Sequence, residues 1–115
     1  MKYTVISFDE LGRLDSSSVR IFREKLAQVT TDNDAIVLDF TGIDFIDSTG
    51  LGAIIAVANS TWGKTELLIS GIKEDIRRIM ELTRLHSVLP LYSSVSAAIE
   101  TLQQKTSTEK FKKAA

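Results

Sequence analysis

The chain has 115 residues, of which 43% are hydrophobic and 25% charged, and its formal net charge is −1. These values are ordinary for one globular domain, and a near-neutral charge argues against a partner as anionic as a nucleic acid or a membrane surface. Cysteine is absent, which excludes disulfides and cysteine-ligated metals, and the single histidine, His86, is a poor basis for a zinc or iron site. We therefore expect neither a metal nor another cofactor.

The sequence predicts a protein that neither crosses a membrane nor leaves the cell. The longest nearly uncharged apolar run, residues 51–58, is much shorter than the about 20 residues that a spanning helix needs. Lys2 is followed at once by polar residues, without the apolar stretch of a signal peptide. We expect a cytoplasmic location.

The first elements follow from alternation and helical spacing. Residues 2–8 alternate like a β-strand, and residues 12–14 are typical of the short return of a hairpin. Asp15 and Ser16 then offer capping oxygens before a helix. The apolar residues expected on one face of this helix are Val19, Phe22, Leu26 and Val29.

The middle of the chain continues to alternate between strands and helices. Residues 35–40 form a dense apolar and β-branched run, which predicts a central strand covered on both sides. A second helix is expected from about residue 49 to 60, and a third long strand over residues 66–70. The apolar face of the next helix would carry Ile72, Ile76, Ile79 and Met80.

The end of the chain predicts a short strand, a helix and a tail. Residues 88–91 fit an edge strand, because Pro90 lacks the N–H group that a central ladder needs. Residues 105–115 lose the apolar pattern and gather four lysines, which indicates a charged, flexible tail after a domain of residues 1–104. The last helical stripe is Val95, Ala98, Ile99 and Leu102.

These elements predict an α/β fold of a single domain. We expect a mixed central sheet of about four to five strands flanked by about four helices, because strands and helices alternate along the chain.

The most informative stretch is residues 36–58, where a buried strand, a tight loop and an apolar helix follow one another. The segment Asp47-Ser48-Thr49-Gly50 lies at the start of that helix. In open α/β sheets, ligands and partners are met outside the carboxyl ends of the strands. Asp47, Ser48 and Thr49 are all favourable N-cap residues, so a purely structural role in capping the helix would account for them equally well.

Two glycines favour a functional interpretation of this helix. A glycine in a helix costs roughly 1 kcal/mol relative to alanine, so Gly50 and Gly52 need a reason. We expect them to let another backbone or an active site approach the Ser48 hydroxyl. The predicted core face is Leu51, Ile54, Ile55 and Ala58. Ala53, Ala56 and Val57 would form a small apolar surface beside Ser48, and full burial of the helix is the competing interpretation.

An ordered set of motifs resembles a known family. The motifs are GRLD at residues 12–15, DSTGLG at 47–52 within IVLDFTGIDFIDSTGLGAI, LLISGIKEDIRRIMELTRLHSVLPLY at 67–92, and SVSAAIETL at 94–102. Together they resemble the STAS domain, and in particular the bacterial anti-sigma factor antagonists.

The resemblance implies a non-enzymatic binding switch. In that family the first hydroxyl residue of the motif, here Ser48, is phosphorylated by the partner, a serine kinase that is also the anti-sigma factor. A metal-dependent serine/threonine phosphatase reverses the step. The unphosphorylated antagonist binds the kinase and frees its client, classically a sigma factor, and Thr49 is the second choice for the modified residue. The residues expected at the partner surface are Asp15, Asp47, Ser48, Thr49, Gly50, Leu51 and Gly52.

Several roles stay open. Asp47 is either a cap or a residue that positions Ser48 or contacts the kinase, and Asp15 is either near the partner surface or a helix cap. Two alternative functions also stay open. An enzyme with Ser48 as nucleophile would have only His86 as a histidine base, and the G-x-S-x-G motif is absent. A STAS module that is a constitutive subunit of a lipid-transport or sensory complex is a further alternative.

Trp62 either covers the end of the apolar helix or, if exposed, is a candidate binding hot spot. We expect a monomer or a weak dimer.

Overall fold

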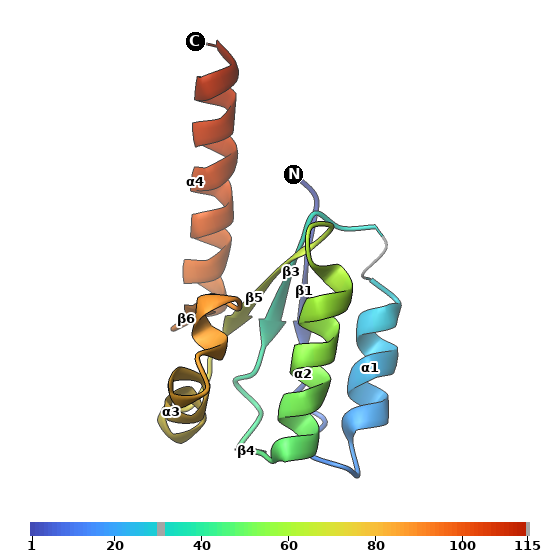
Figure 1. The fold of residues 1–115 in the computed structure, drawn as a ribbon. Helices are drawn as coiled ribbons and strands as arrows, with labels where there is room; N and C mark the ends of the chain where they lie inside the picture. Colours follow the sequence, from blue (N-terminus) through green and yellow to red (C-terminus); the bar gives the residue numbers. More distant parts are fainter. Residues whose placement is uncertain (30–31, 115) are drawn as a thin grey trace.

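The main sheet has four strands, and all of them are parallel. The computed structural model describes residues 1–29 and 32–114, with side chains described up to residue 104. The strand order is β1-β3-β5-β6, and every neighbouring pair is parallel. The strands are β1 (Tyr3–Ser7), β3 (Ala35–Asp39), β5 (Glu66–Ser70) and β6 (Leu91–Tyr92) (Figure 1). The α/β class is confirmed, while the pairing in the described sheets is parallel where the sequence suggested a mixed sheet.

A second, very small sheet replaces the expected hairpin. Strand β2 (Arg13–Leu14) pairs in parallel with β4 (Phe45–Ile46), a strand that the sequence did not predict. The hairpin prediction for residues 12–14 is wrong because the chain passes from β2 directly into the first helix. Gly12 makes the turn before β2 with a left-handed φ of +65°, a conformation that favours glycine.

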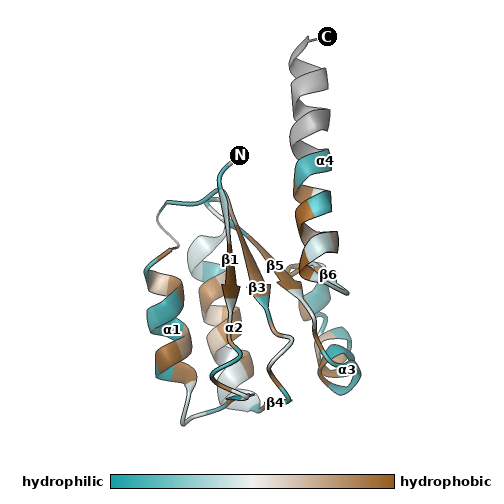
Figure 2. Ribbon diagram, turned by 180° about the vertical axis from the view of Figure 1, so that it is seen from behind, coloured by the Kyte–Doolittle hydropathy of each residue, from teal (hydrophilic) through white to brown (hydrophobic). Residues whose placement is uncertain are grey.

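Helices connect the strands and cover both faces of the sheet. Helices α1 and α2 lie side by side on one face, and α4 lies on the other, where it contacts β3, β5 and β6 (Figures 1 and 2). Within the described residues no helix is both long and apolar enough to cross a bilayer. The helices are α1 (Val19–Ala27), α2 (Ser48–Thr61), α3 (Glu74–Leu82), the 3-10 turn η1 (Leu85–Ser87) and α4 (Val95–Ala114).

Helix α4 is longer than the sequence suggested. Its backbone continues to Ala114, through the segment for which we expected a tail, and in Figure 1 it extends beyond the end of the sheet. Side chains after residue 104 lie outside the described residues, so the domain boundary at that position stays a prediction.

Strand β3 separates two apolar cores. Ile36 and Leu38 point into the larger core, which they share with residues of α1, α2 and α3. Ala35 and Val37 point into a smaller core under α4. A strand buried on both faces needs apolar residues at every position, which explains the continuous apolar run. The larger core contains three aromatic rings with centroids 5.0–6.3 Å apart, those of Phe8, Phe22 and Phe40.

The last strand lies at the sheet edge, as expected, but it begins three residues later than predicted, at Leu91. Strand β6 begins after Pro90, whose carbonyl accepts a hydrogen bond from the Ile69 N–H at 2.9 Å. Proline keeps its acceptor although it has no donor, so it can join the ladder on this one side.

Candidate functional site

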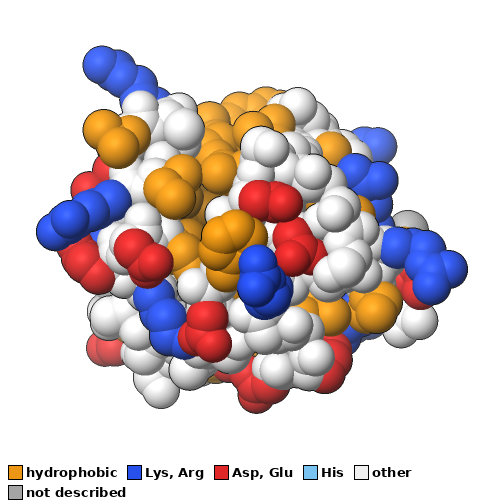
Figure 3. Space-filling model, turned by 90° about the horizontal axis from the view of Figure 1, so that it is seen from below, with side chains coloured by type: hydrophobic (Ala, Val, Ile, Leu, Met, Phe, Trp, Pro, Cys, Tyr) orange, Lys and Arg blue, Asp and Glu red, His pale blue; other side chains and the backbone are white. Residues whose placement is uncertain are grey.

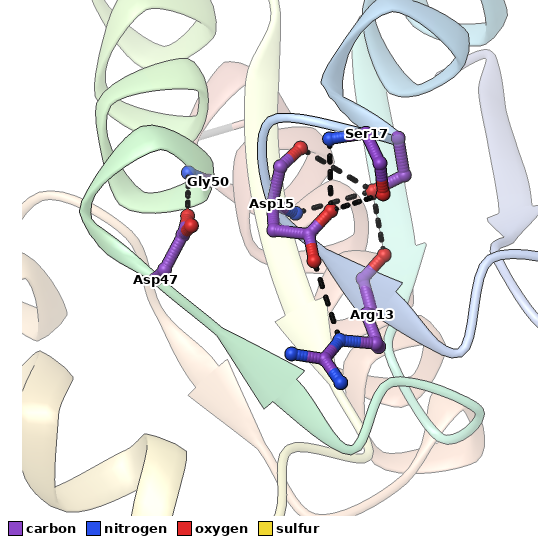
Figure 4. A network of polar contacts seen from close by, with 6 residues as sticks. Arg13, Asp15, Ser17, Asp47 and Gly50 are labelled. Atoms are coloured by element: carbon purple, nitrogen blue, oxygen red, sulfur yellow. Dashed lines mark hydrogen bonds and ion pairs between the residues drawn. The ribbon is translucent and has the colours of Figure 1, made fainter.

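Helix α2 begins at Ser48, immediately after strand β4, with Asp47 as its N-cap. The Asp47 carboxylate (Oδ1) accepts a hydrogen bond from the Gly50 N–H at 2.9 Å, and the Asp47 carbonyl accepts one from the Leu51 N–H at 2.9 Å. Figure 4 shows this carboxylate directed at the first turn of the helix. The capping interpretation of Asp47 is therefore confirmed, while a contact with a partner stays a prediction.

The two hydroxyl residues of the motif lie at the surface. Both Ser48 and Thr49 are exposed, and neither side chain has a hydrogen-bond partner in the described part of the chain. The serine hydroxyl thus meets the first requirement for modification by an enzyme, which is access from solvent.

The two glycines of the motif have different roles. A Cβ on Gly50 would lie 2.1 Å from the Leu14 carbonyl oxygen of strand β2 and 3.0 Å from the Ile46 side chain. Gly50 is therefore required by internal packing, and the expectation that it opens an approach to Ser48 is wrong. Gly52 is exposed and a Cβ there would meet nothing within 4 Å, so it can still serve an approaching partner.

Helix α2 buries most of the expected face, because Ile54 is buried and Ala58 packs partly buried against the larger core. Two assignments are wrong: Ala53, expected at the surface, is buried in the larger core, and Ile55, expected in the core, is 40% exposed. Residues 48, 52 and 55 are four and three positions apart and share one exposed face of the helix. Leu51 is partly buried against the core, and Ala56 is exposed.

Asp15 organises the turn between β2 and α1. Its Oδ1 accepts hydrogen bonds from the Ser17 N–H at 3.0 Å and the Ser17 hydroxyl at 2.6 Å, and its Oδ2 accepts one from Arg13 Nε at 3.2 Å. These bonds, first of all those from Ser17, lower the pKa of the Asp15 carboxyl. The N-cap residue of α1 is Ser18, so the prediction that Asp15 or Ser16 caps this helix is wrong.

The small sheet fixes Asp15 and Asp47 at one end of the molecule. In the β2–β4 pairing Arg13 lies opposite Phe45 and Leu14 opposite Ile46, and the Asp47 N–H donates to the Leu14 carbonyl at 3.3 Å. Figure 4 shows the Asp15 network beside the start of α2. The structure thus brings together segments that the sequence separates by helix α1 and strand β3.

Sequence reasoning missed an exposed aromatic residue at this end. Phe45 is 43% exposed, and the Arg13 guanidinium lies 4.4 Å from the centre of its ring, a cation–π contact. Figure 3 views this end and shows hydrophobic side chains among acidic and basic ones. The signal in the sequence was weak, because a two-residue strand offers a single alternation of an outward Phe45 and an inward Ile46.

Other candidate chemistry finds little support in the described residues. His86 is exposed on η1, with its Nδ1 3.4 Å from the Met80 carbonyl. Ser48 has no hydrogen bond to a base in the described part of the chain, and the described residues contain no group of three or more acidic or histidine side chains placed to hold a metal ion. Trp62 does not cover the end of α2, because 71% of it is exposed.

Three solved structures share this fold at low sequence identity. The anti-sigma factor antagonist SpoIIAA in its unphosphorylated form is 22% identical, with a TM-score of 0.65 over 90% of this chain and 91% of that one. TM1081 of Thermotoga maritima, named as an anti-sigma factor antagonist, is 18% identical, with a TM-score of 0.68 over 87% of this chain and 81% of that one. A sulfate transporter family protein from Wolinella succinogenes is 15% identical, with a TM-score of 0.76 over 89% of this chain and 85% of that one.

Comparisons of sequence give the family. BtrV of Bordetella bronchiseptica, named as an anti-sigma factor antagonist, is 32% identical over 106 residues, which cover 85% of this chain and 91% of BtrV. The model of the STAS domain matches residues 2–98. The match includes all the strands of both sheets and the Ser48 turn, so the chain belongs to the STAS domain family and resembles its anti-sigma factor antagonists.

Proposed function

We propose that this protein is a phosphorylation-controlled binding switch of the anti-sigma factor antagonist type. In its unphosphorylated form it binds a serine kinase that is also an anti-sigma factor, and the kinase then releases its client, a sigma factor. Phosphorylation of Ser48 abolishes this binding, and a metal-dependent serine/threonine phosphatase restores it. The protein itself catalyses neither step, because the general base, Mg²⁺ and ATP for phosphoryl transfer come from the kinase.

The observation that carries the proposal is the exposed Ser48 hydroxyl at the first position of a supported helix. Asp47 caps α2 through Gly50, and Gly50 itself packs on the Leu14 carbonyl, so the serine is displayed from a turn held on two sides. Support also comes from the SpoIIAA structure, which is described as that of an unphosphorylated form and has the same fold.

The fold can accept a phosphoryl group without rearrangement. A phosphoserine carries about −1.5 to −2 charges and three acceptor oxygens. The first-turn N–H groups of a helix lack intrahelical partners, and the helix dipole favours negative charge at that end. We therefore expect the modified protein to stay folded.

A partner that fits the neutral hydroxyl would be excluded by the phosphate. The partner would have to desolvate a strongly charged group, on a surface that already carries the Asp47 and Asp15 carboxylates. A penalty of about 3 kcal/mol weakens binding by roughly 100-fold, which is enough for a switch. The surface that we propose for the partner is Ser48, Thr49, Gly52 and Leu51, flanked by Phe45, Ile55 and the Asp15–Arg13 pair.

The test is to isolate the partner and map the modification. We expect tagged protein from its native cell to retain a kinase that, with ATP, adds one phosphoryl group to the wild type and to Thr49→Ala but none to Ser48→Ala. Phosphorylated protein should no longer retain the kinase. If Ser48 stays unmodified and a stable complex persists with ATP, the protein is instead a constitutive subunit. If Ser48→Ala is modified as fast as the wild type, the assigned residue is wrong.

A further inference from the structure

The end of α2 opposite to Ser48 carries a large exposed aromatic side chain that the proposed function does not use. Trp62 follows the last residue of the helix, and 71% of it is exposed. Tryptophan is a large apolar residue that is enriched in protein interfaces and is a frequent hot spot. It is also the only tryptophan of the chain. One exposed apolar side chain is ordinary by itself, so the surface around Trp62 decides whether it belongs to a contact with another molecule.

A groove lies beside Trp62 at the edge where strand β5 begins. One part is a hollow of about 520 Å³, whose apolar lining is formed by Ala58, Trp62, Leu67, Val88, Leu89 and Pro90. A second hollow of about 630 Å³ continues it on the polar side and shares Asp34, Thr61, Lys64 and Thr65 with it. The surface therefore has a protruding apolar side chain next to an apolar hollow.

The polar part of the groove carries charges of both signs. Lys64 is exposed and has no ion pair in the described part of the chain. Asp32 and Asp34 line the same hollow and are exposed. Asp34 accepts a hydrogen bond from the Lys2 N–H at 2.7 Å, and Asp32 lies 3.7 Å from the Lys2 ammonium, so both retain free lone pairs. The cation and the anions are close in the groove but not paired with one another.

We propose that this groove binds a second copy of the same chain in a two-fold symmetric dimer. A surface with an apolar projection beside an apolar hollow, and a free cation beside carboxylates, is complementary to itself. A two-fold axis brings each feature onto its counterpart, as an isologous interface requires. Each Trp62 enters the hollow of the other copy, and each Lys64 approaches Asp34 of the other copy.

The size of the features sets the strength of this dimer. A tryptophan buries about 150–250 Å² at most, so two of them with their rims bury less than the about 1,600 Å² of a standard stable interface. We therefore expect a weak, reversible dimer with a dissociation constant above about 1 µM. Helix α2 has 14 residues and is about 21 Å long, so the groove lies well away from Ser48. The dimer thus leaves the Ser48 surface free, and phosphorylation does not alter it.

The single tryptophan makes a direct test possible. We would measure sedimentation equilibrium and tryptophan emission of the full chain from about 1 to 500 µM, a range that brackets a weak dimer. The expected result is a mass that rises from monomer to dimer, with a blue shift of the emission over the same concentrations. Trp62→Ala should weaken dimerisation at least about 30-fold, as for a hot-spot residue. Lys64→Glu should weaken it most at low salt.

The matched control is Leu82→Ala. Leu82 is 84% exposed on α3 and does not line the groove, so its loss should leave the dimer unchanged. Circular dichroism verifies that each variant is folded. A monomer with unshifted emission at every concentration would overturn the proposal, as would a dimer that survives Trp62→Ala. An emission shift that occurs only after another protein is added would overturn it too, because the groove would then belong to a different partner.

Discussion

The two ends of helix α2 are both exposed, but they differ in how the rest of the protein supports them. The first turn is held by the Asp47 cap, by contact of Gly50 with the Leu14 carbonyl, and by the small β2–β4 sheet. The last turn ends at Trp62, which stands in solvent beside an open groove. A rigid end suits the display of one small hydroxyl group, and an apolar, open end suits docking. The two ends can therefore serve two separate interactions.

The largest expected effect is a loss of stability when the packing of the first turn of α2 is disrupted. Gly50→Ala should lower the free energy of unfolding by about 3 kcal/mol, because its Cβ would lie 2.1 Å from a backbone carbonyl oxygen that cannot move aside. Gly52→Ala is the matched control. It adds the same methyl group to open space and should be neutral or stabilise by up to about 1 kcal/mol. Urea denaturation of the two variants measures the difference, and equal stabilities would contradict the role of Gly50.

The second prediction separates the two ends by function. Ser48→Asp should keep the circular dichroism spectrum of the wild type and lose about 100-fold in affinity for the kinase that co-purifies with the protein. Trp62→Ala should retain the wild-type affinity in the same calorimetric titration. If Trp62→Ala loses as much affinity as Ser48→Asp, the two ends form a single surface and the comparison fails.

The third prediction concerns the cap. Asp47→Ala should cost about 1 kcal/mol of stability, because the Gly50 N–H loses its acceptor at the start of α2. Asp47→Asn keeps a capping oxygen and should recover most of this loss. Thermal unfolding distinguishes the three proteins, and a stable Asp47→Ala variant would show that the cap contributes little to the first turn.

The smallest effect is a titration beside the first turn. The hydrogen bonds from Ser17 lower the pKa of Asp15, so its carboxylate stabilises the fold at pH values above its ordinary pKa of about 3.9. This contribution disappears as the pH falls through the lowered pKa of the folded state. Carbon-detected NMR titration should show that Ser17→Ala raises the pKa of Asp15. An unchanged pKa would mean that Ser17 does not organise this turn.

Elements with a local pattern could be predicted from the sequence. Strand β5 is found at its predicted residues, and β3 differs from its prediction only at the last residue. The face of α1 that carries Phe22 and Leu26 is buried, as its spacing predicted. In each of these cases the deciding information, alternation or helical spacing, lies within the segment itself.

Elements that depend on distant contacts could not be predicted. Strands β2 and β4 have two residues each, so neither has a pattern of its own, and each exists because the other lies beside it. Ile55 and Ala53 of α2 were assigned to the wrong sides because the helix is apolar on all sides and has no clear periodicity. Gly50 is required because it packs against a carbonyl of β2, which is distant in the sequence. Without knowledge of that contact, the glycine was interpreted as opening a surface for a partner.

The small sheet also has a consequence for the timing of the proposed switch. The β2–β4 pairing holds the serine turn in the unmodified protein, and if it does the same after phosphorylation, no slow refolding step need accompany the change of charge. The response time of the cell would then be set by the kinase and the phosphatase alone. Neither the core nor the turn would have to unfold during a cycle of phosphorylation and dephosphorylation, so one molecule could be reused through many rounds of signalling.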